Sequence, residues 1–180
     1  FKDSVITGEH VLLALSQFQI TLLSVNSKYD AIRQGVDTFS EQEKKGYHLF
    51  LKHCNSCHKE PLFFENKYEN NGLKVDTFLN DFGRWNITKV SRDSLKFKIP
   101  SLRNLSYTKP YMHDGRFNSL NKVLNHYSNE VVLYNNLAPS LKKGISLSAE
   151  DKVDLIAFLL TLNDQKFTLN KKHKNPNIYP

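Results

Sequence analysis

The 180-residue sequence contains very little sulfur, with two cysteines and one methionine. Cys54 and Cys57 are separated by only two residues, so they cannot connect distant parts of a fold. This spacing excludes a framework of long-range disulfides, the device that stabilises many small secreted domains. The close pair instead predicts a local chemical site.

Long hydrophobic runs are also missing. The mean hydropathy is −0.49, and no apolar run approaches the roughly 18 residues of a membrane-spanning helix. We therefore expect no transmembrane segment. The sequence starts at Phe1 without an initiator Met or an apolar leader, which predicts either a removed leader or a piece of a longer polypeptide.

The charge is positive but dispersed. The formal net charge is +7, and the one concentrated basic cluster, Lys171 to Lys174, lies near the C-terminus. A positive sum without a basic stripe does not predict nucleic-acid binding.

Helical signals occur at both ends of the chain. Apolar residues at helical spacing predict an amphipathic helix over about 8–25, followed by a short helix or loop up to Phe39. A capping-box pattern at Ser40–Glu43 predicts a helix from about 41 to Cys54. We expect this helix to direct Leu49 and Phe50 into the core.

Two further helices are expected in the second half. Leu120, Val123, Leu124 and Tyr127 recur at helical spacing, and Ser148 is a good N-cap for a helix over about 149–162. The expected buried face of this last helix consists of Val153, Ile156, Ala157 and Leu160. The polar tail beyond, with Pro176 and Pro180, should wrap a surface or fray.

The segment Lys59–Asn118 has a different character. It is rich in Gly, Pro, Asn and Asp and has no sustained helical period. Such a long irregular stretch in a compact domain needs an anchor. A large prosthetic group would provide one, so the fold class is mainly α with long ordered loops.

Cys54-Asn55-Ser56-Cys57-His58 is the C-x-x-C-H signature of covalent haem attachment. In such a site the two thiols bind the vinyl groups of haem c, and the adjacent His58 supplies the proximal iron ligand. A structural zinc site would need further ligands, with His48 and His53 as the nearest candidates. A redox dithiol would need a βαβ context that is missing here. We therefore favour haem over both alternatives and over a chance match.

Several residues can supply the sixth iron ligand. Met112 is the one thioether of the chain, and His113, His126 and Tyr127 also lie downstream. On composition alone Met112 is favoured, because His/Met ligation is common in electron-transfer cytochromes.

The surroundings of this motif resemble the bacterial dihaem cytochrome c peroxidase and MauG family over about residues 10–166. The most specific block is Thr108–Phe117, followed by His126 and Tyr127. Further blocks of the resemblance are Leu49-Phe50, Glu60–Phe63, Asn70–Leu73, Asp81, Gly83-Arg84, Ile87-Thr88, Asp93, Phe97–Asn104 and Leu155–Leu159.

The resemblance implies a class I cytochrome c-like helical domain with long ordered loops around a covalently bound haem. It matches only the C-terminal, electron-entry half of the family, so a second haem is expected in a missing N-terminal half. The implied organisation has three parts. Residues 1–39 form a helix and crossover segment that packs on the other half, 40–166 form the haem domain and 167–180 form a tail.

The resemblance also changes the expected sixth ligand. Family peroxidases place an axial Met fourteen positions after the His of the His-Asp-Gly block, and this position is Tyr127 here. MauG-type members use a Tyr at the corresponding place. The preferred ligand is therefore Tyr127, with Met112 as the alternative.

A calcium ion between the two halves is implied as well, bound by the backbone carbonyls of Thr108 and Pro110. Carbonyl oxygens suit this hard cation. Arg103 and Arg116 are candidate partners of the haem propionates, because guanidinium groups pair well with carboxylates.

The function implied by the resemblance is electron relay. This half would receive electrons from a small cytochrome c or cupredoxin and pass them to a peroxidatic haem that reduces hydrogen peroxide to water. One alternative is a MauG-like oxidase, and another is a stand-alone single-haem electron carrier. Dimers are common in the family, so a homodimer is one expected assembly. Covalent haem attachment predicts a periplasmic or otherwise extracytoplasmic location.

Overall fold

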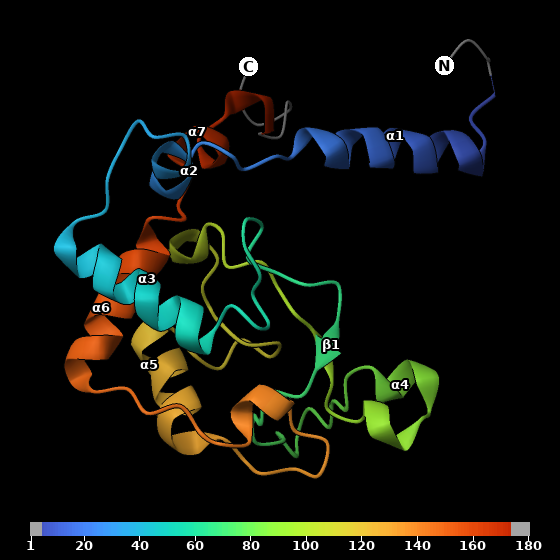
Figure 1. Ribbon diagram of the computed structural model, residues 1–180. Coiled ribbons are helices and arrows are strands. Elements are labelled where there is room, and N and C mark those ends of the chain that lie inside the picture. The colour runs from blue at the N-terminus through green and yellow to red at the C-terminus, as the bar shows by residue number, and fades with distance from the viewer. Residues whose placement is uncertain (1–4, 174–180) are drawn as a thin grey trace.

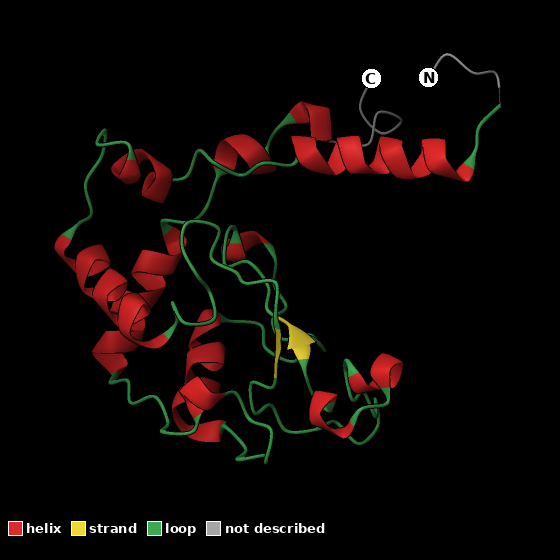
Figure 2. Cartoon of the chain, turned by 45° about the vertical axis from the view of Figure 1, so that its right-hand side comes forward, coloured by secondary structure: helices red, strands yellow, loops and turns green. Residues whose placement is uncertain are grey.

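The protein is described by a computed structural model that covers residues 5–173 (Figure 1). Most of its regular structure is helical, as Figure 2 shows, and the rest consists largely of loops. This confirms the prediction of a mainly α fold with long loops. The helices are α1 (Gly8–Thr21), α2 (Lys28–Arg33), α3 (Glu41–His53), α4 (Trp85–Thr88), α5 (Leu120–Asn125), α6 (Ala149–Leu160) and α7 (Gln165–Thr168), and the strands are β1 (Tyr68–Glu69) and β2 (Phe97–Lys98).

Helix α3 begins and ends where the sequence predicts. The Ser40 hydroxyl accepts from the amide of Glu43 at 3.2 Å, and the Glu43 carboxylate accepts from the amide of Ser40 at 2.7 Å. At the other end Cys54 is the C-cap, and its amide donates to the Phe50 carbonyl at 2.8 Å. The helix therefore ends at the C-x-x-C-H motif.

Helices α3 and α6 cross at a glycine. A Cβ atom on Gly46 would lie 1.9 Å from the backbone oxygen of Asp154, so only glycine permits this approach. Around the crossing lies an aromatic core in which Phe50, Phe63 and Phe158 have no exposed surface. The other buried members of this core are Tyr29, Leu124, Leu155, Leu159 and Leu162.

The predicted buried face of α6 was wrong in part. Val153 and Leu160 are 55% and 44% exposed, whereas Leu155 and Phe158 are buried. The close approach at Gly46 explains the difference, because it turns the stretch from Asp154 to Phe158 toward α3. Ile156 is partly buried against the same core.

Helix α1 projects from the rest of the molecule (Figures 1 and 2). It ends at Thr21 instead of near residue 25, and none of its residues is buried. Its exposed apolar side chains are Val11, Leu12, Leu13, Leu15, Phe18 and Ile20. The predicted helix is present, but in the described part of the chain nothing covers its apolar side chains.

The segment after α1 is fixed by a fully buried carboxylate. Asp164 accepts from the Asn26 amide at 2.9 Å and from the Ser24 hydroxyl at 3.3 Å, and it also caps α7 through the Phe167 amide at 2.9 Å. The connection between α1 and α2 is thus attached to the start of α7, directly after α6.

The loop region 59–118 contains one short antiparallel pair, in which Tyr68 is opposite Lys98 and Glu69 is opposite Phe97. At the C-terminus, α7 and a 3₁₀ turn at Lys171–His173 follow α6. Lys174, Pro176 and Pro180, named in the expected tail, lie outside the described residues. Within residues 5–173 there is no helix that is both long and apolar enough to span a membrane.

The close approach of Gly46 to the backbone of Asp154 predicts that a side chain at position 46 destabilises the fold. Gly46→Ala should lower the free energy of unfolding by at least about 2 kcal/mol, because the backbone of Asp154 cannot move aside easily. Helix propensity alone would favour alanine by about 1 kcal/mol. Urea unfolding measures the change, with Gly8→Ala as the control, since nothing lies near a Cβ at Gly8. Equal stability of the two variants would refute the close approach.

Candidate functional site

The chemistry-bearing residues of the motif share one tight turn at the end of α3. The amide of Cys57 donates to the Cys54 carbonyl at 3.1 Å, and the amide of His58 donates to the same carbonyl at 2.9 Å. Both cysteines are free thiols and partly buried. The turn therefore brings two thiols and one imidazole into a single short segment.

His58 is held in one tautomer. Its Nδ1 atom donates to the backbone carbonyl of Pro100 at 3.0 Å, and an imidazole that donates through Nδ1 keeps the lone pair of Nε2 available for a metal. Burial lowers the pKa of His58, although hydrogen bonds to the carbonyls of Pro100 and Phe63 oppose this effect. Both features suit a neutral ligand.

Burial strongly affects the phenol of Tyr127. It belongs to a π-helical turn, His126–Glu130, which directly follows α5. Burial raises the pKa of Tyr127 to about 12, and nearby Cys54 and Cys57 contribute in the same direction. Burial also raises the pKa of the Cys54 thiol to about 12. A bound metal ion would have to supply the positive charge that stabilises the phenolate at this depth.

The side chains of the candidate site are shielded by the chain but keep some exposed surface. Cys54, Cys57, His58 and Tyr127 are all only partly buried by surface area, although burial dominates the pKa shifts of three of them. Apolar residues Leu137, Ala138, Leu141 and Ile145 form a second buried cluster, against which Tyr127 packs. Two thiols, a tautomer-fixed imidazole and apolar walls fit a thioether-linked haem.

The other candidate ligands are occupied elsewhere. The buried His126 donates through Nε2 to the Asn71 carbonyl at 3.1 Å. His113 stacks on Phe97 with ring centroids 3.6 Å apart. The Met112 thioether accepts from the Asn71 amide at 3.6 Å.

Both candidate propionate partners have partners within the chain. Arg103 donates to both carboxylate oxygens of Asp30 at 2.8 Å and to the Pro61 carbonyl at 2.8 Å. Arg116 pairs with Asp114 and donates to the Lys74 carbonyl at 2.8 Å. These contacts give the propionate role no support, and it stays a prediction.

The sequence also offered a zinc site near His48 and His53 and a calcium site at Thr108 and Pro110. Across residues 5–173 no group of three or more His, Cys, Asp or Glu side chains could hold a metal ion. The zinc alternative at His48 and His53 therefore has no ligand set there. Thr108 and Pro110 are exposed, and nothing in their contacts tests the predicted calcium.

Sequence reasoning missed a cluster that attaches α2 to the motif loop. Tyr29 of α2 donates to the Glu60 carboxylate at 2.5 Å, and Tyr47 of α3 donates to it at 3.1 Å. Asp30, the next residue of α2, binds Arg103, which reaches Pro61. No local sequence motif indicates these pairs, because their members are far apart in the sequence.

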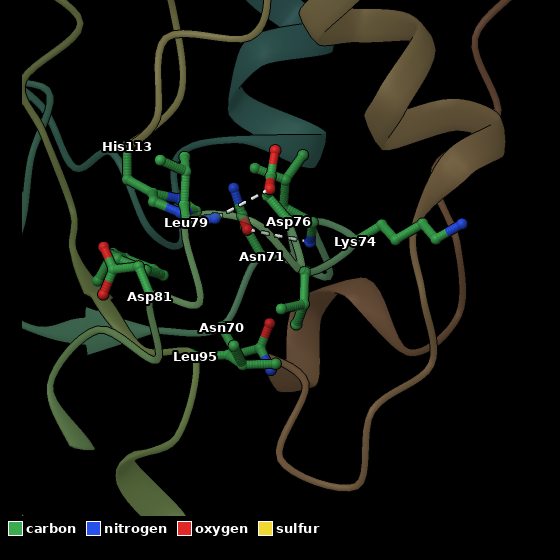
Figure 3. Close-up of a pocket in the computed structure, with 11 residues that line it drawn as sticks. Asn70, Asn71, Lys74, Asp76, Leu79, Asp81, Leu95 and His113 are labelled. Atoms are coloured by element: carbon green, nitrogen blue, oxygen red, sulfur yellow. Dashed lines mark hydrogen bonds between the residues drawn. The ribbon is translucent and has the colours of Figure 1, made fainter. Parts of the chain in front are cut away.

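A small pocket lies beside the candidate site (Figure 3). Asn71 and His113 line it, together with Asp76 and Asp81, but no residue of the C-x-x-C-H motif does. In Figure 3 the Asn71 side-chain oxygen accepts from the Leu73 amide, at 3.2 Å. The pocket is therefore a neighbour of the candidate site and not the site itself.

Comparisons with known proteins identify two kinds of relative. The chain is 34% identical over 164 residues to cytochrome c peroxidase Ccp of Escherichia coli, covering 87% of this chain and 33% of that protein. It is 36% identical over 169 residues to the methylamine utilization protein MauG of Methylorubrum extorquens, covering 89% of this chain and 46% of that protein. No family model matches. The chain thus spans less than half the length of these two relatives.

Solved structures agree with the sequence comparison. A MauG-like protein associated with microbial copper homeostasis matches with a TM-score of 0.86 and 29% identity, covering 97% of this chain and 59% of that one. The diheme peroxidase BthA from Burkholderia thailandensis matches with a TM-score of 0.62, 19% identity and coverage of 78% and 47%, which shows a shared fold. These likenesses confirm the predicted fold class and the resemblance to this family.

The ion pair of Asp30 and Arg103 predicts how the free energy of unfolding depends on pH. Burial alone would raise the pKa of Asp30, but hydrogen bonds from Arg103 and Ser27 outweigh it and hold the pKa below the ordinary value of 3.8. The stabilisation from this ionised carboxylate is therefore complete above pH 4 or so and is lost as the pH falls further. Asp30→Asn should cost about 1–3 kcal/mol near neutral pH.

The difference between wild type and Asp30→Asn should shrink when urea unfolding is repeated below about pH 3.5. The control is Asp37→Asn. Asp37 is exposed, and its carboxylate accepts a local hydrogen bond from the Thr38 amide at 2.7 Å. A difference that stays constant with pH would contradict the role given to Asp30.

Proposed function

Because this chain belongs to the family of the cytochrome c peroxidases and MauG proteins, we propose that it is the electron-entry haem domain of a peroxidase-type oxidoreductase. One haem c would be bound here through Cys54 and Cys57, with His58 as its proximal ligand. Electrons would pass from it to a second haem in a companion domain, where hydrogen peroxide is reduced to water. The observation that carries the proposal is the hydrogen bond from Nδ1 of His58 to the Pro100 carbonyl, which directs the other ring nitrogen to a metal on the same turn as the two cysteines.

When bound, the haem supplies the redox chemistry, and the chain's own residues position and tune it. The Pro100 carbonyl accepts the Nδ1 proton and so fixes the ring of His58. The apolar cluster against which Tyr127 packs provides one apolar wall of the site. Electrostatic interactions beside such a wall are stronger than in bulk water.

A second function is favoured by Tyr127. A phenolate ligand stabilises ferric and higher oxidation states, whereas a thioether favours ferrous iron and a high potential. The place of Tyr127, fourteen positions after His113 in the sequence, supports a MauG-like oxidase, in which peroxide drives oxidation of another substrate. A single-haem carrier would instead use Met112.

The companion domain also explains α1. Residues 1–39 would pack on that domain through the apolar side chains of α1, residues 40–166 would hold the haem, and 167–180 would form a tail. The support is that none of the residues of α1 is buried, together with the match of 97% of this chain to a longer solved protein. An apolar helix of this length is only marginally stable in water without a covering surface.

The remaining partners follow from the same family. We propose a small cytochrome c or cupredoxin as electron donor, and a calcium ion on the carbonyls of Thr108 and Pro110 at the boundary between the halves. Because covalent haem is attached outside the cytoplasm, we propose a periplasmic or otherwise extracytoplasmic location. A homodimer, as in other members, is the proposed assembly, and sedimentation of the native gene product tests it.

The first experiment counts haems in the native gene product by pigment assay and intact mass. We expect two haems, peroxide turnover, and slow hydrogen exchange in α1 because the companion domain covers it. A single haem without turnover would overturn the peroxidase proposal in favour of an electron carrier. Fast exchange throughout α1 in a two-haem product would refute only the docking of α1.

A second experiment tests the sixth ligand. Tyr127→Phe should change the visible spectrum of the oxidised protein and raise its midpoint potential, because an anionic ligand of ferric iron is lost. Met112→Leu should leave both properties as they are. Tyr134→Phe is the matched control, since the Tyr134 hydroxyl only accepts from the Val75 amide, at 3.4 Å. If Met112→Leu changes the spectrum and Tyr127→Phe does not, Met112 is the ligand.

A further inference from the structure

The segment 100–103 is hydrogen-bonded along the loop that follows His58. At its start, the Pro100 carbonyl accepts from Nδ1 of His58 at 3.0 Å. Two further hydrogen bonds join the segment to the loop, from the Ser101 hydroxyl to the Leu62 carbonyl at 2.7 Å and from the Leu102 amide to the Phe63 carbonyl at 3.2 Å. The acceptor of the His58 proton therefore belongs to a segment that is attached to the loop at several points.

The side chain of Arg103 joins this segment to helix α2 and to the same loop. It is 8% exposed and donates to both carboxylate oxygens of Asp30 and to the Pro61 carbonyl, each at 2.8 Å. Its guanidinium carbon lies 5.9 Å from the ring centroid of Tyr29 and 5.6 Å from that of Phe63. Because the guanidinium is planar and rigid, one side chain fixes α2 and the loop relative to the segment.

The backbone of Arg103 is attached to the residue that follows Pro100. The Arg103 amide donates to the Ser101 hydroxyl at 3.3 Å, and this hydroxyl donates in turn to the Leu62 carbonyl. A displacement of Arg103 would therefore reach the Pro100 carbonyl through Ser101.

We propose that Arg103 is a positioning residue for His58: held by Asp30, it keeps the Pro100 carbonyl at hydrogen-bonding distance from Nδ1. A hydrogen bond donated by one ring nitrogen makes the other a more basic ligand, and a more basic ligand stabilises ferric iron. Arg103 thus lowers the midpoint potential of the haem by acting through Pro100 and His58. This inference rests on the proposed haem at His58.

The competing role for Arg103 is direct pairing with a haem propionate. Its Nε atom is buried and has no hydrogen-bond partner among residues 5–173, and guanidinium groups pair well with carboxylates. The two roles predict opposite changes of the potential when Arg103 is removed. Loss of the positioning effect raises the potential, whereas loss of a positive charge in contact with a propionate lowers it, because that charge stabilises the reduced haem.

The test is the midpoint potential of the haem bound to His58 in the haem-loaded native gene product. The double variant Asp30→Asn/Arg103→Met removes both charges of the ion pair, so the net charge of the protein stays the same. Replacement of a whole buried pair is also tolerated better than loss of one partner. We expect a higher potential than in the wild type, and nitrogen NMR of the reduced protein should show a weaker hydrogen bond at Nδ1 of His58.

A second variant keeps the positive charge. Arg103→Lys has no planar fork with which to bind Asp30 and the Pro61 carbonyl together. It should therefore also raise the potential and weaken the hydrogen bond of His58, although the charge at position 103 is unchanged. This variant provides the test on its own if the double variant does not fold.

The matched control is an ion pair that attaches α2 elsewhere. Lys28 of α2 donates to the Glu43 carboxylate of α3 at 2.9 Å, and neither residue binds segment 100–103. Lys28→Met/Glu43→Gln removes this pair without changing the net charge, and glutamine retains an oxygen for the capping box of α3. It should lower stability but leave the potential and the nitrogen signal of His58 as they are.

Each outcome supports or refutes the inference. If the Arg103 variants carry haem on His58 with the potential and nitrogen signal of the wild type, the role of Arg103 is refuted and the proposed function stands. A lower potential in the double variant would identify a propionate partner instead. A rise of the same size in the control would assign the effect to the attachment of α2 and refute the inference as well. If the wild type carries no haem at His58, the proposed function itself fails.

Discussion

The contact between α3 and α6 at Gly46 is the constraint on which the site depends. Because the backbone of Asp154 lies where a side chain would begin, the two helices cross with their backbones almost touching. The crossing buries Phe50, one turn before Cys54, against Phe158. This packing fixes the end of α3 and therefore the position of the turn that carries the two thiols and the imidazole.

A second set of contacts extends this rigidity to the crossover segment. Two consecutive residues of α2, Tyr29 and Asp30, bind Glu60 directly and Pro61 through Arg103. The segment between α1 and α2 is in turn fixed by the buried Asp164. Buried polar groups therefore attach the crossover segment at two places, at Asp164 after α1 and at Glu60 and Arg103 beside α2. Breaking such buried hydrogen bonds is costly.

Local signals account for what could be predicted from the sequence. Ser40 and Glu43 determine where α3 begins by a local exchange of hydrogen bonds, and the C-x-x-C-H motif carries its chemistry within five residues. The buried face of α6 could not be read in the same way. Its rotation depends on Gly46, about a hundred residues earlier, because close backbone contact overrides the preference of Val153 for burial.

The sixth ligand, Tyr127 or Met112, is far from the C-x-x-C-H motif in the sequence, so no local motif identifies it. By composition the one thioether was the natural ligand, and only the resemblance to relatives favoured Tyr127. Tyr127 belongs to a π-helical turn directly after α5 and packs against the second apolar cluster, whereas Met112 lies in the loop region 59–118. If the phenolate is the ligand, it stabilises ferric and higher oxidation states, and if the thioether is the ligand, it favours ferrous iron and a high potential. The two ligands therefore correspond to the two functions proposed for this chain, because chemistry at high oxidation states needs the first and simple electron transfer needs the second.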